Sequence, residues 1–367
     1  MASPSQTDAT PGADTLALNN SAPQHRPRPL PLFLAMLRSE TVGDGDALAA
    51  GLAGLRAYQT AKRLASTPPM PVVATSGRAV LRDYGGAGRP VIFVPSLINS
   101  HDVLDLLPET SLLRWLSTQG VRPLLVDWGA PSPDERDMSI GDHVGMLLPL
   151  IEAIGPDAAL AGYCLGGTMA LAAALCRSPS ALVTIAAPWR FAGFPEKSRK
   201  GIADLWEQTR PTVESMGMMP LEVLQTAFWR LDPRRTVEKF IAFGRKQASP
   251  EATRLFVALE DWANGGAPLT AAAGREMAED FFRDDIPGSG RWQVAGKVIN
   301  PAALACPLLD IVSSTDRIVP AASAVSGTGV GDAMTLGLGH VGMIVGGRAR
   351  ETLWQPLAQW LAQPHMR

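Results

Sequence analysis

The sequence predicts an α/β fold: a mainly parallel, doubly wound sheet with helices on both faces, interrupted by a helical lid insertion. Short apolar, β-rich runs alternate with helical stretches, and such an alternation buries a parallel sheet between two layers of helices. The alternation stops after Ala181–Ala187 and resumes only at Ala305. The segment between them is therefore expected to be an insertion between two strands of one sheet.

The strands are expected where β-rich apolar runs are bounded by turn residues. These runs are residues 71–74, 79–84, 90–95, 121–127, 158–163, 181–187, 305–313 and 333–338. Apolar periodicity predicts helices at residues 106–119, 140–154, 168–176 and 350–361. Residues 31–66 also have a helical pattern, and the proline-rich stretch Thr67–Pro71 separates them from the sheet.

The chain is expected to divide into consecutive segments. They are a disordered tail at 1–30, a helical segment at 31–70, the first part of the core at 71–189, a helical lid at 190–300 and the second part of the core at 301–363. The tail is rich in Ser, Thr, Pro, Asn and Gln and has no apolar region after a basic start, so we do not expect a signal peptide.

Composition narrows the function classes. Apolar residues make up 46% of the 367 residues, which is enough for a full core, and a net charge of −2 argues against nucleic acid or an anionic membrane as the main partner. The three cysteines cannot all pair and form no Cys-x-x-Cys, which predicts a reducing, cytoplasmic location and no zinc site. The apolar run 158–176 is better explained by a buried strand and core helix than by a transmembrane segment, because it contains three glycines.

One hexapeptide carries the strongest chemical signal. Residues 162–167 read Gly-Tyr-Cys-Leu-Gly-Gly at an expected strand-to-helix turn, a pattern typical of the nucleophile elbow of the α/β-hydrolase fold, with Cys164 in place of serine. The helix N-terminus favours a thiolate, and the N–H of Leu165 is placed to donate to an oxyanion. The alternative is a structural cysteine in a glycine-rich packing turn.

An elbow of this kind predicts an acid and then a histidine later in the chain. Asp316 follows the expected strand at 305–313, and His340 follows the last strand in a glycine-flanked turn. The other histidines precede the elbow or lie at a chain end: His25, His101, His143 and His365. We therefore predict Cys164, Asp316 and His340 as the catalytic set.

A second oxyanion donor is expected in the loop after the strand at 90–95. That loop reads Pro95-Ser96-Leu97-Ile98-Asn99, and the backbone N–H of either Leu97 or Ile98 is a candidate.

The lid segment is rich in aromatic and basic residues. Its tryptophans are Trp189, Trp206, Trp229, Trp262 and Trp292. Most are expected to form the lid's own core, and some are expected to line an apolar channel to Cys164. Its basic residues include Arg190, Lys197, Arg199, Lys200, Arg234 and Arg235. These are expected on solvated helix faces, with phosphate contacts to a nucleotide-bearing acyl carrier as the alternative.

Taken in order, these motifs resemble the polyhydroxyalkanoate synthase family, α/β-hydrolase relatives, from about residue 71 to 363. The segments that carry the resemblance are Pro95–Asn99, Val126–Gly129, Gly162–Gly167, Asp316–Pro320 and Gly339–Gly342. The resemblance implies a cytoplasmic acyltransferase that polymerises 3-hydroxyacyl groups from coenzyme A thioesters into polyester granules, without a further cofactor. It also implies Cys164 as the acylated nucleophile, His340 as general base, and Asp316 as the residue that orients His340 or activates the chain hydroxyl.

The resemblance leaves the partners and the exact activity open. The short N-terminal part looks like the smaller synthases that work with a separate partner subunit, and a homodimer is compatible with it. The chain departs from the family pattern at Leu97, Asp102 and Arg317. These departures keep two alternatives in view: a cysteine-dependent hydrolase, such as a thioesterase or a dienelactone-hydrolase-like esterase, and a non-catalytic granule-associated protein. Dienelactone hydrolases share the elbow but lack a long lid.

Overall fold

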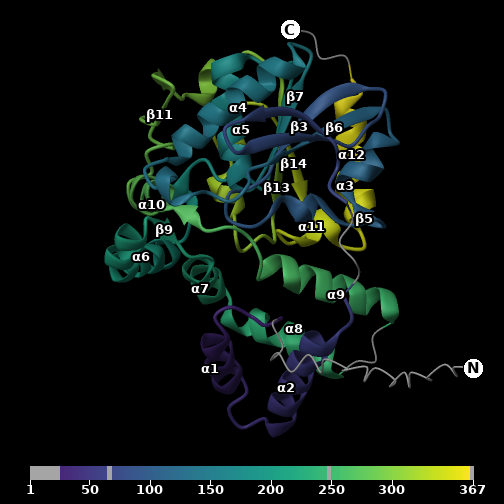
Figure 1. The fold of residues 1–367 in the computed structure, drawn as a ribbon, viewed down its shortest axis with the longest axis vertical. Helices are drawn as coiled ribbons and strands as arrows, with labels where there is room; N and C mark the ends of the chain where they lie inside the picture. Colours follow the sequence, from purple (N-terminus) through teal and green to yellow (C-terminus); the bar gives the residue numbers. More distant parts are fainter. Residues whose placement is uncertain (1–24, 64–67, 246–248, 364–367) are drawn as a thin grey trace, which may run out of the picture.

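An eight-stranded sheet forms the centre of the molecule (Figure 1). The computed structural model describes residues 25–63, 68–245 and 249–363. The strand order is β1-β2-β6-β3-β7-β8-β13-β14. Only β2 runs antiparallel to its neighbours in this sheet, and all the other pairings are parallel. This order and the single reversed strand give the α/β-hydrolase fold, which confirms the predicted fold class.

Each strand expected from the sequence is present, with ends that shift by a few residues. The strands of the sheet are β1 (Val72–Ser76), β2 (Ala79–Asp83), β3 (Arg89–Val94), β6 (Val121–Asp127), β7 (Ala159–Tyr163), β8 (Leu182–Ile185), β13 (Leu308–Ser313) and β14 (Asp332–Leu336). All residues of β7, β8 and β13 are buried. Strands covered on both faces have continuous apolar runs rather than alternation, which is why these were recognisable from sequence.

Helices cover both faces of the sheet. The core helices are α3 (Leu112–Ser117), α4 (Ile140–Ile154), α5 (Leu165–Arg177), α11 (Gly342–Val345) and α12 (Gln355–Leu361), with a π-helical turn at Arg350–Trp354 before α12. Helices α4 and α5 share one hydrophobic cluster, while α3, α11 and α12 share the cluster on the other face. Single 3-10 turns lie at His101–Leu104, Pro133–Glu135, Phe191–Gly193, Pro301–Ala303, Ala321–Ser323 and Val325–Thr328.

The predicted helix at 106–119 is wrong over its first half. Residues Asp105–Leu107 (β4) and Thr110–Ser111 (β5) form a small hairpin, and only α3 is helical. Pro108 lies in the turn of that hairpin, where it prevents the carbonyl–amide pairing a continuous helix needs. The hydroxyl of Ser111 accepts the N–H of Arg114, so the helix begins there.

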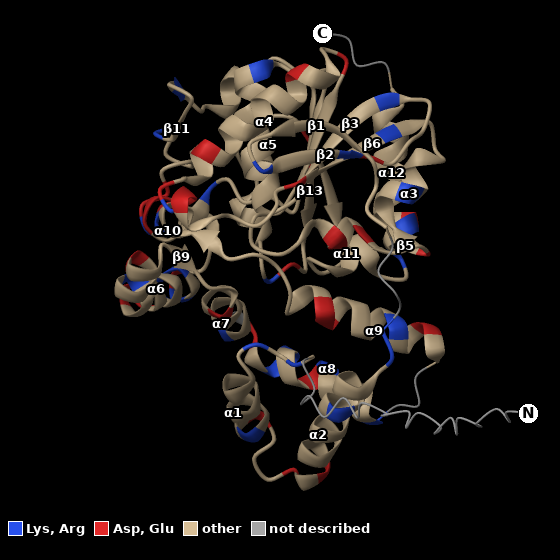
Figure 2. Ribbon diagram, in the orientation of Figure 1, with Lys and Arg blue, Asp and Glu red and all other residues tan. Residues whose placement is uncertain are grey.

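The insertion between β8 and β13 forms a cap of helices. Its helices are α6 (Glu196–Met216), α7 (Leu221–Leu231), α8 (Pro233–Arg245), α9 (Pro250–Ala263), α10 (Ala271–Arg275) and a π-helix (Glu276–Arg283). Two short antiparallel strand pairs accompany them: β9 (Met218–Met219) with β10 (Leu269–Thr270), and the hairpin β11 (Gln293–Val294) with β12 (Lys297–Val298). Helices α6 and α10 lie beside the core, whereas α9 lies across its lower end (Figure 1). Figure 2 shows that charges of both signs lie on these helices, while the sheet carries few.

The N-terminal helices are part of the same cap. Helices α1 (Leu30–Glu40) and α2 (Gly45–Thr60) pack on α8 at the end of the molecule away from the sheet (Figure 1). A Cβ on Gly54 would lie 2.0 Å from the carbonyl oxygen of Phe240, so α2 and α8 touch backbone to backbone. The helical segment predicted at 31–66 is thus two helices that share a core with the lid.

The expected disordered tail lies outside the described residues up to residue 24. The described part of it, residues 25–29, runs beside α9, where the N–H of Arg28 donates to Oδ1 of Asn264 at 2.9 Å. Residues 64–67, at the expected break before the sheet, are also outside the description.

Candidate active site

Cys164 sits at a sharp turn between β7 and α5. Its φ is +56° and its ψ is −132°, an unusual conformation for a residue with a side chain. Its N–H donates to the carbonyl of Ile185 at 2.9 Å, and its carbonyl accepts the N–H of Gly167 at 2.8 Å. These bonds hold the strained residue in place and present its side chain at the carboxyl end of the sheet.

The glycines around Cys164 are required by close backbone contacts. A Cβ on Gly162 would lie 2.4 Å from the carbonyl oxygen of Gly166, and one on Gly166 would lie 2.1 Å from that of Val94. A Cβ on Gly167 would lie 2.3 Å from the Cβ of Ala187. The elbow motif therefore follows from the tight approach of the turn to strands β3 and β8.

The structure brings the three predicted residues together. Cys164, Asp316 and His340 follow β7, β13 and β14, and parallel strands of one sheet end at the same edge. His340 Nδ1 lies 2.6 Å from Asp316 Oδ2, and both side chains are buried. The other carboxylate oxygen, Oδ1, accepts the N–H groups of Ile318 and Val319. Since Asp316 occupies Nδ1, the Nε2 atom of His340 is left for its hydrogen bond with the Cys164 thiol.

Tyr163 also holds the histidine, and sequence reasoning missed it. Its ring stacks on the imidazole of His340 with centroids 5.0 Å apart, and its hydroxyl donates to the His340 carbonyl at 3.2 Å. Its position directly before Cys164 was the available signal, because the strand then fixes where its ring points.

The charges of this group act on the pKa of His340. Burial alone lowers that pKa, but the charges of Cys164 and Asp316 and the hydrogen bonds to both raise it to about 10 from an ordinary value of 6.5. A histidine that stays protonated at this place can donate a proton to a leaving group or an oxyanion.

We expect the His340 ring to titrate near pH 10 in the folded protein, and to titrate lower in Asp316→Asn because the carboxylate charge is lost. NMR of ¹³C-labelled histidine measures this directly. Because folding raises the pKa of His340 above 6.5, the protonated side chain stabilises the folded protein. This stabilisation is fully present below pH 6.5 and is lost as the pH rises through about 10. A wild-type midpoint near 6.5 would contradict the ion pair.

The candidate oxyanion donors differ in whether their N–H groups are free and in whether they line the cavity. Within the described residues, the N–H groups of Leu165 and Leu97 have no acceptor, whereas that of Ile98 donates to Oγ of Ser96 at 3.1 Å. Ile98, however, lines the cavity above Cys164, and Leu97 does not. The free N–H favours Leu97 and the position favours Ile98, so the second donor stays a prediction between them.

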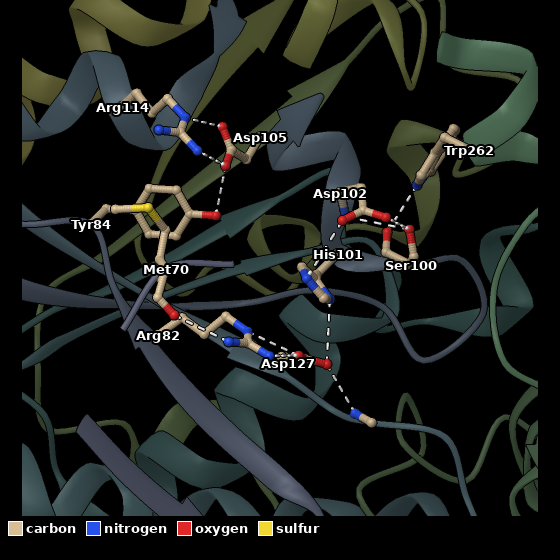
Figure 3. A network of polar contacts seen from close by, with 11 residues as sticks. Met70, Arg82, Tyr84, Ser100, His101, Asp102, Asp105, Arg114, Asp127 and Trp262 are labelled. Carbon is tan, nitrogen blue, oxygen red and sulfur yellow. Dashed lines mark hydrogen bonds and ion pairs between the residues drawn. The ribbon is translucent and has the colours of Figure 1, made fainter. Parts of the chain in front are cut away.

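A polar network anchors the loop that carries these candidates (Figure 3). His101 lies between two carboxylates, 3.6 Å from Asp127 and 3.6 Å from Asp102. The indole N–H of Trp262, on lid helix α9, donates to the carbonyl of Ser100 at 2.9 Å. The lid and the loop after β3 are thus joined at the lining of the cavity that Cys164 also lines.

A cavity of about 470 Å³ opens above Cys164, between the core and helices α7, α8 and α9. Of the lid tryptophans, Trp229 and Trp262 line it. Trp189, Trp206 and Trp292 belong instead to the main hydrophobic cluster. The prediction that only some aromatics reach the channel is consistent with this division.

Charged residues at the cavity come from several elements, including α8, α9 and the segment after β13. Of the basic residues considered from the sequence, only Arg235 lines the cavity. Lys239 also lines it and lies 2.6 Å from Glu260 of α9, an ion pair that sequence reasoning missed because its partners are on different helices. Among the departures from the family pattern, Arg317 lines the cavity and pairs with Asp232, whereas Asp102 does not reach it.

The described residues contain neither a candidate metal site nor a candidate membrane-spanning helix. In residues 25–63, 68–245 and 249–363, no group of three or more histidine, cysteine or acidic side chains is placed to hold a metal ion. No helix in these ranges combines the length and the apolar character needed to cross a membrane.

Comparison with known proteins finds similar sequences but no matching protein-family model. The chain is 26% identical over 295 residues to the poly(3-hydroxyalkanoate) polymerase subunit PhaC of Haloferax mediterranei, covering 75% of this chain and 58% of that protein. It is 26% identical over 289 residues to the subunit of the same name from Allochromatium vinosum, covering 74% and 80%. The chain thus spans about 60% of the length of two of these relatives: 58% of the subunit from Haloferax mediterranei and 61% of the subunit of the same name from Haloarcula marismortui.

Solved structures are more distant. An α/β hydrolase fold protein from Nakamurella multipartita is 17% identical with a TM-score of 0.46, over 79% of this chain and 98% of that one. An esterase from Exiguobacterium antarcticum is 15% identical with a TM-score of 0.45, over 78% and 96%.

Proposed function

The chain is homologous to the poly(3-hydroxyalkanoate) polymerase subunits, and on that ground we propose that it transfers 3-hydroxyacyl groups from coenzyme A thioesters to a growing polyester. The observation that supports this most is a partly buried thiol beside a buried imidazole and carboxylate, all lining one largely apolar cavity.

The proposed reaction has two steps. The Cys164 thiolate attacks the thioester carbonyl, the bond from that carbon to the coenzyme A sulfur breaks, and coenzyme A leaves with a proton from His340. The 3-hydroxyl of a second acyl unit then attacks the acyl-cysteine carbonyl and gives its proton to His340. The bond from that carbonyl carbon to the Cys164 sulfur breaks, and the thiolate is released. Thiol-for-thiol exchange is nearly isoenergetic, so a cysteine suits the first step.

The cap supports transfer over hydrolysis. Helices α7 and α9 line the cavity with apolar side chains that include Phe228, Trp229 and Leu259. A covered apolar site keeps water from the acyl-cysteine while another acyl unit enters.

The experiment that tests the proposal is intact-protein mass spectrometry after mixing with 3-hydroxybutyryl-CoA, with free coenzyme A followed over time. We expect a ladder of added hydroxybutyryl units on the protein together with coenzyme A release. The reaction is run with and without a candidate partner subunit, because the need for a partner and the association with a granule or a second copy are themselves proposals.

Other outcomes identify other functions. Steady coenzyme A release with at most one transient adduct identifies a thioesterase or lactone-type hydrolase. Neither adduct nor release, with or without the partner, overturns the catalytic proposal and favours the non-catalytic granule protein.

A further inference from the structure

Gln225 carries a buried amide at the wall of the active-site cavity. It lies on α7, is 5% exposed, and lines the cavity above Cys164. Within the part of the chain that the structure describes, its carboxamide makes no hydrogen bond. Its amide oxygen and nitrogen are not among the side-chain atoms that are wholly buried without a partner, so the amide faces the open cavity, where a bound molecule can reach it.

The residues of α7 that line the cavity next to Gln225 are apolar. Phe228 and Trp229 follow it at helical spacings of three and four and line the same cavity, and Leu255 and Leu259 of α9 line it as well. A leucine in place of Gln225 would be of similar size and would complete this wall without a desolvation cost. The amide therefore has no packing explanation.

Other polar groups that line the cavity are already engaged. Lys239 pairs with Glu260, Asp232 pairs with Arg317, and the hydroxyl of Thr236 donates to the carbonyl of Asp232. The guanidinium of Arg235 has no acceptor among the described residues, but Arg235 is exposed. Gln225 is thus a deeply buried side chain of this lining whose donor and acceptor are both left available to a molecule in the cavity.

We propose that Gln225 is a specificity-determining residue that recognises the oxygen at position 3 of the acyl group. A 3-hydroxyl donates to Oε1 of the amide. Once that hydroxyl has been esterified, the ester carbonyl accepts a hydrogen bond from the Nε2 amino group. An amide serves both states because it carries a donor and an acceptor, which a carboxylate or an alkyl side chain does not. This inference rests on the proposed function and adds a residue to it.

The test compares 3-hydroxybutyryl-CoA with butyryl-CoA, which lacks only the hydroxyl. Single-turnover acylation of Cys164 is measured for wild type, Gln225→Leu and Thr226→Val. The control residue Thr226 is half-buried on the same helix and does not line the cavity, and its hydroxyl donates to the Glu222 carbonyl. We expect wild type and Thr226→Val to prefer the hydroxyacyl substrate by at least about tenfold, and Gln225→Leu to lose that preference while its butyryl rate stays within about threefold.

A binding measurement separates this inference from the proposed function. In Cys164→Ala protein, which cannot be acylated at this position, calorimetry gives the affinities for both thioesters with and without the additional Gln225→Leu substitution. A preference for the hydroxyacyl ligand that disappears in Gln225→Leu supports the inference even if no acylation occurs in the wild type. A preference that survives Gln225→Leu, or equal affinities in the parent protein, overturns it.

Discussion

Replacing Cys164 with alanine should lower coenzyme A release from 3-hydroxybutyryl-CoA by about 10⁴-fold or more, because the only proposed acyl acceptor is removed. The fold should survive, since alanine is smaller and Cys164 is held through backbone bonds that alanine keeps. Release is measured by thiol titration of free coenzyme A under saturating substrate, and Cys164→Ser is tested beside it.

Cys306→Ala is the matched control. Cys306 lies before β13, at the end of the sheet away from the site, and burial raises the pKa of its thiol to about 11. It therefore supplies little thiolate at neutral pH, and its loss should leave turnover within about twofold. Substantial release by Cys164→Ala would place the nucleophile elsewhere.

Replacing Gly54 with alanine should lower the free energy of unfolding by about 2 kcal/mol, as expected for an overpacked contact. The new Cβ would lie 2.0 Å from the Phe240 carbonyl oxygen and 3.0 Å from the backbone nitrogen of Gly244. Neither group can turn aside as a side chain would, so α2 and α8 must separate. Urea denaturation followed by tryptophan fluorescence measures the change, and Trp229 lies in the affected cluster.

Gly201→Ala provides a control of opposite sign. Gly201 is also in a helix, α6, but a Cβ there would meet nothing within 4 Å. Alanine is a better helix former than glycine, so this variant should gain up to about 1 kcal/mol. If Gly54→Ala behaves in the same way, the close contact between α2 and α8 is not as described.

The strands and the order of the site residues could be predicted because their signals are local. Strands β7, β8 and β13 are buried along their whole length, which leaves continuous apolar runs in the sequence. The elbow glycines are required by contacts within one turn and its neighbouring strands, so the motif survives as a short pattern. In the α/β-hydrolase fold the acid and then the histidine follow the elbow along the chain, which predicts Asp316 and His340 once Cys164 is identified.

Features that depend on contacts between distant segments could not be predicted. The hairpin at Asp105–Ser111 is stabilised in part by the pairing of Asp105 with Arg114, and its apolar residues also fit a helical pattern. Helices α1 and α2 pack against the lid through contacts with α8, which lies far along the chain from them. That the Gln225 amide has no hydrogen-bond partner is visible only once the surrounding helices are in place. Its spacing to Phe228 and Trp229 could, however, have placed all three side chains on one face of a helix.

The contact between α2 and α8 also sets an order of events during protein synthesis. Gly54 and Gly244 are 190 residues apart, 244 minus 54, and at about 5–20 residues per second the ribosome takes roughly 10–40 s to cover that distance. During this interval Phe33, Leu37 and Tyr58, which α8 later covers, lack that partner helix. These residues of the nascent chain are therefore exposed to aggregation or chaperone binding until α8 can pack on them.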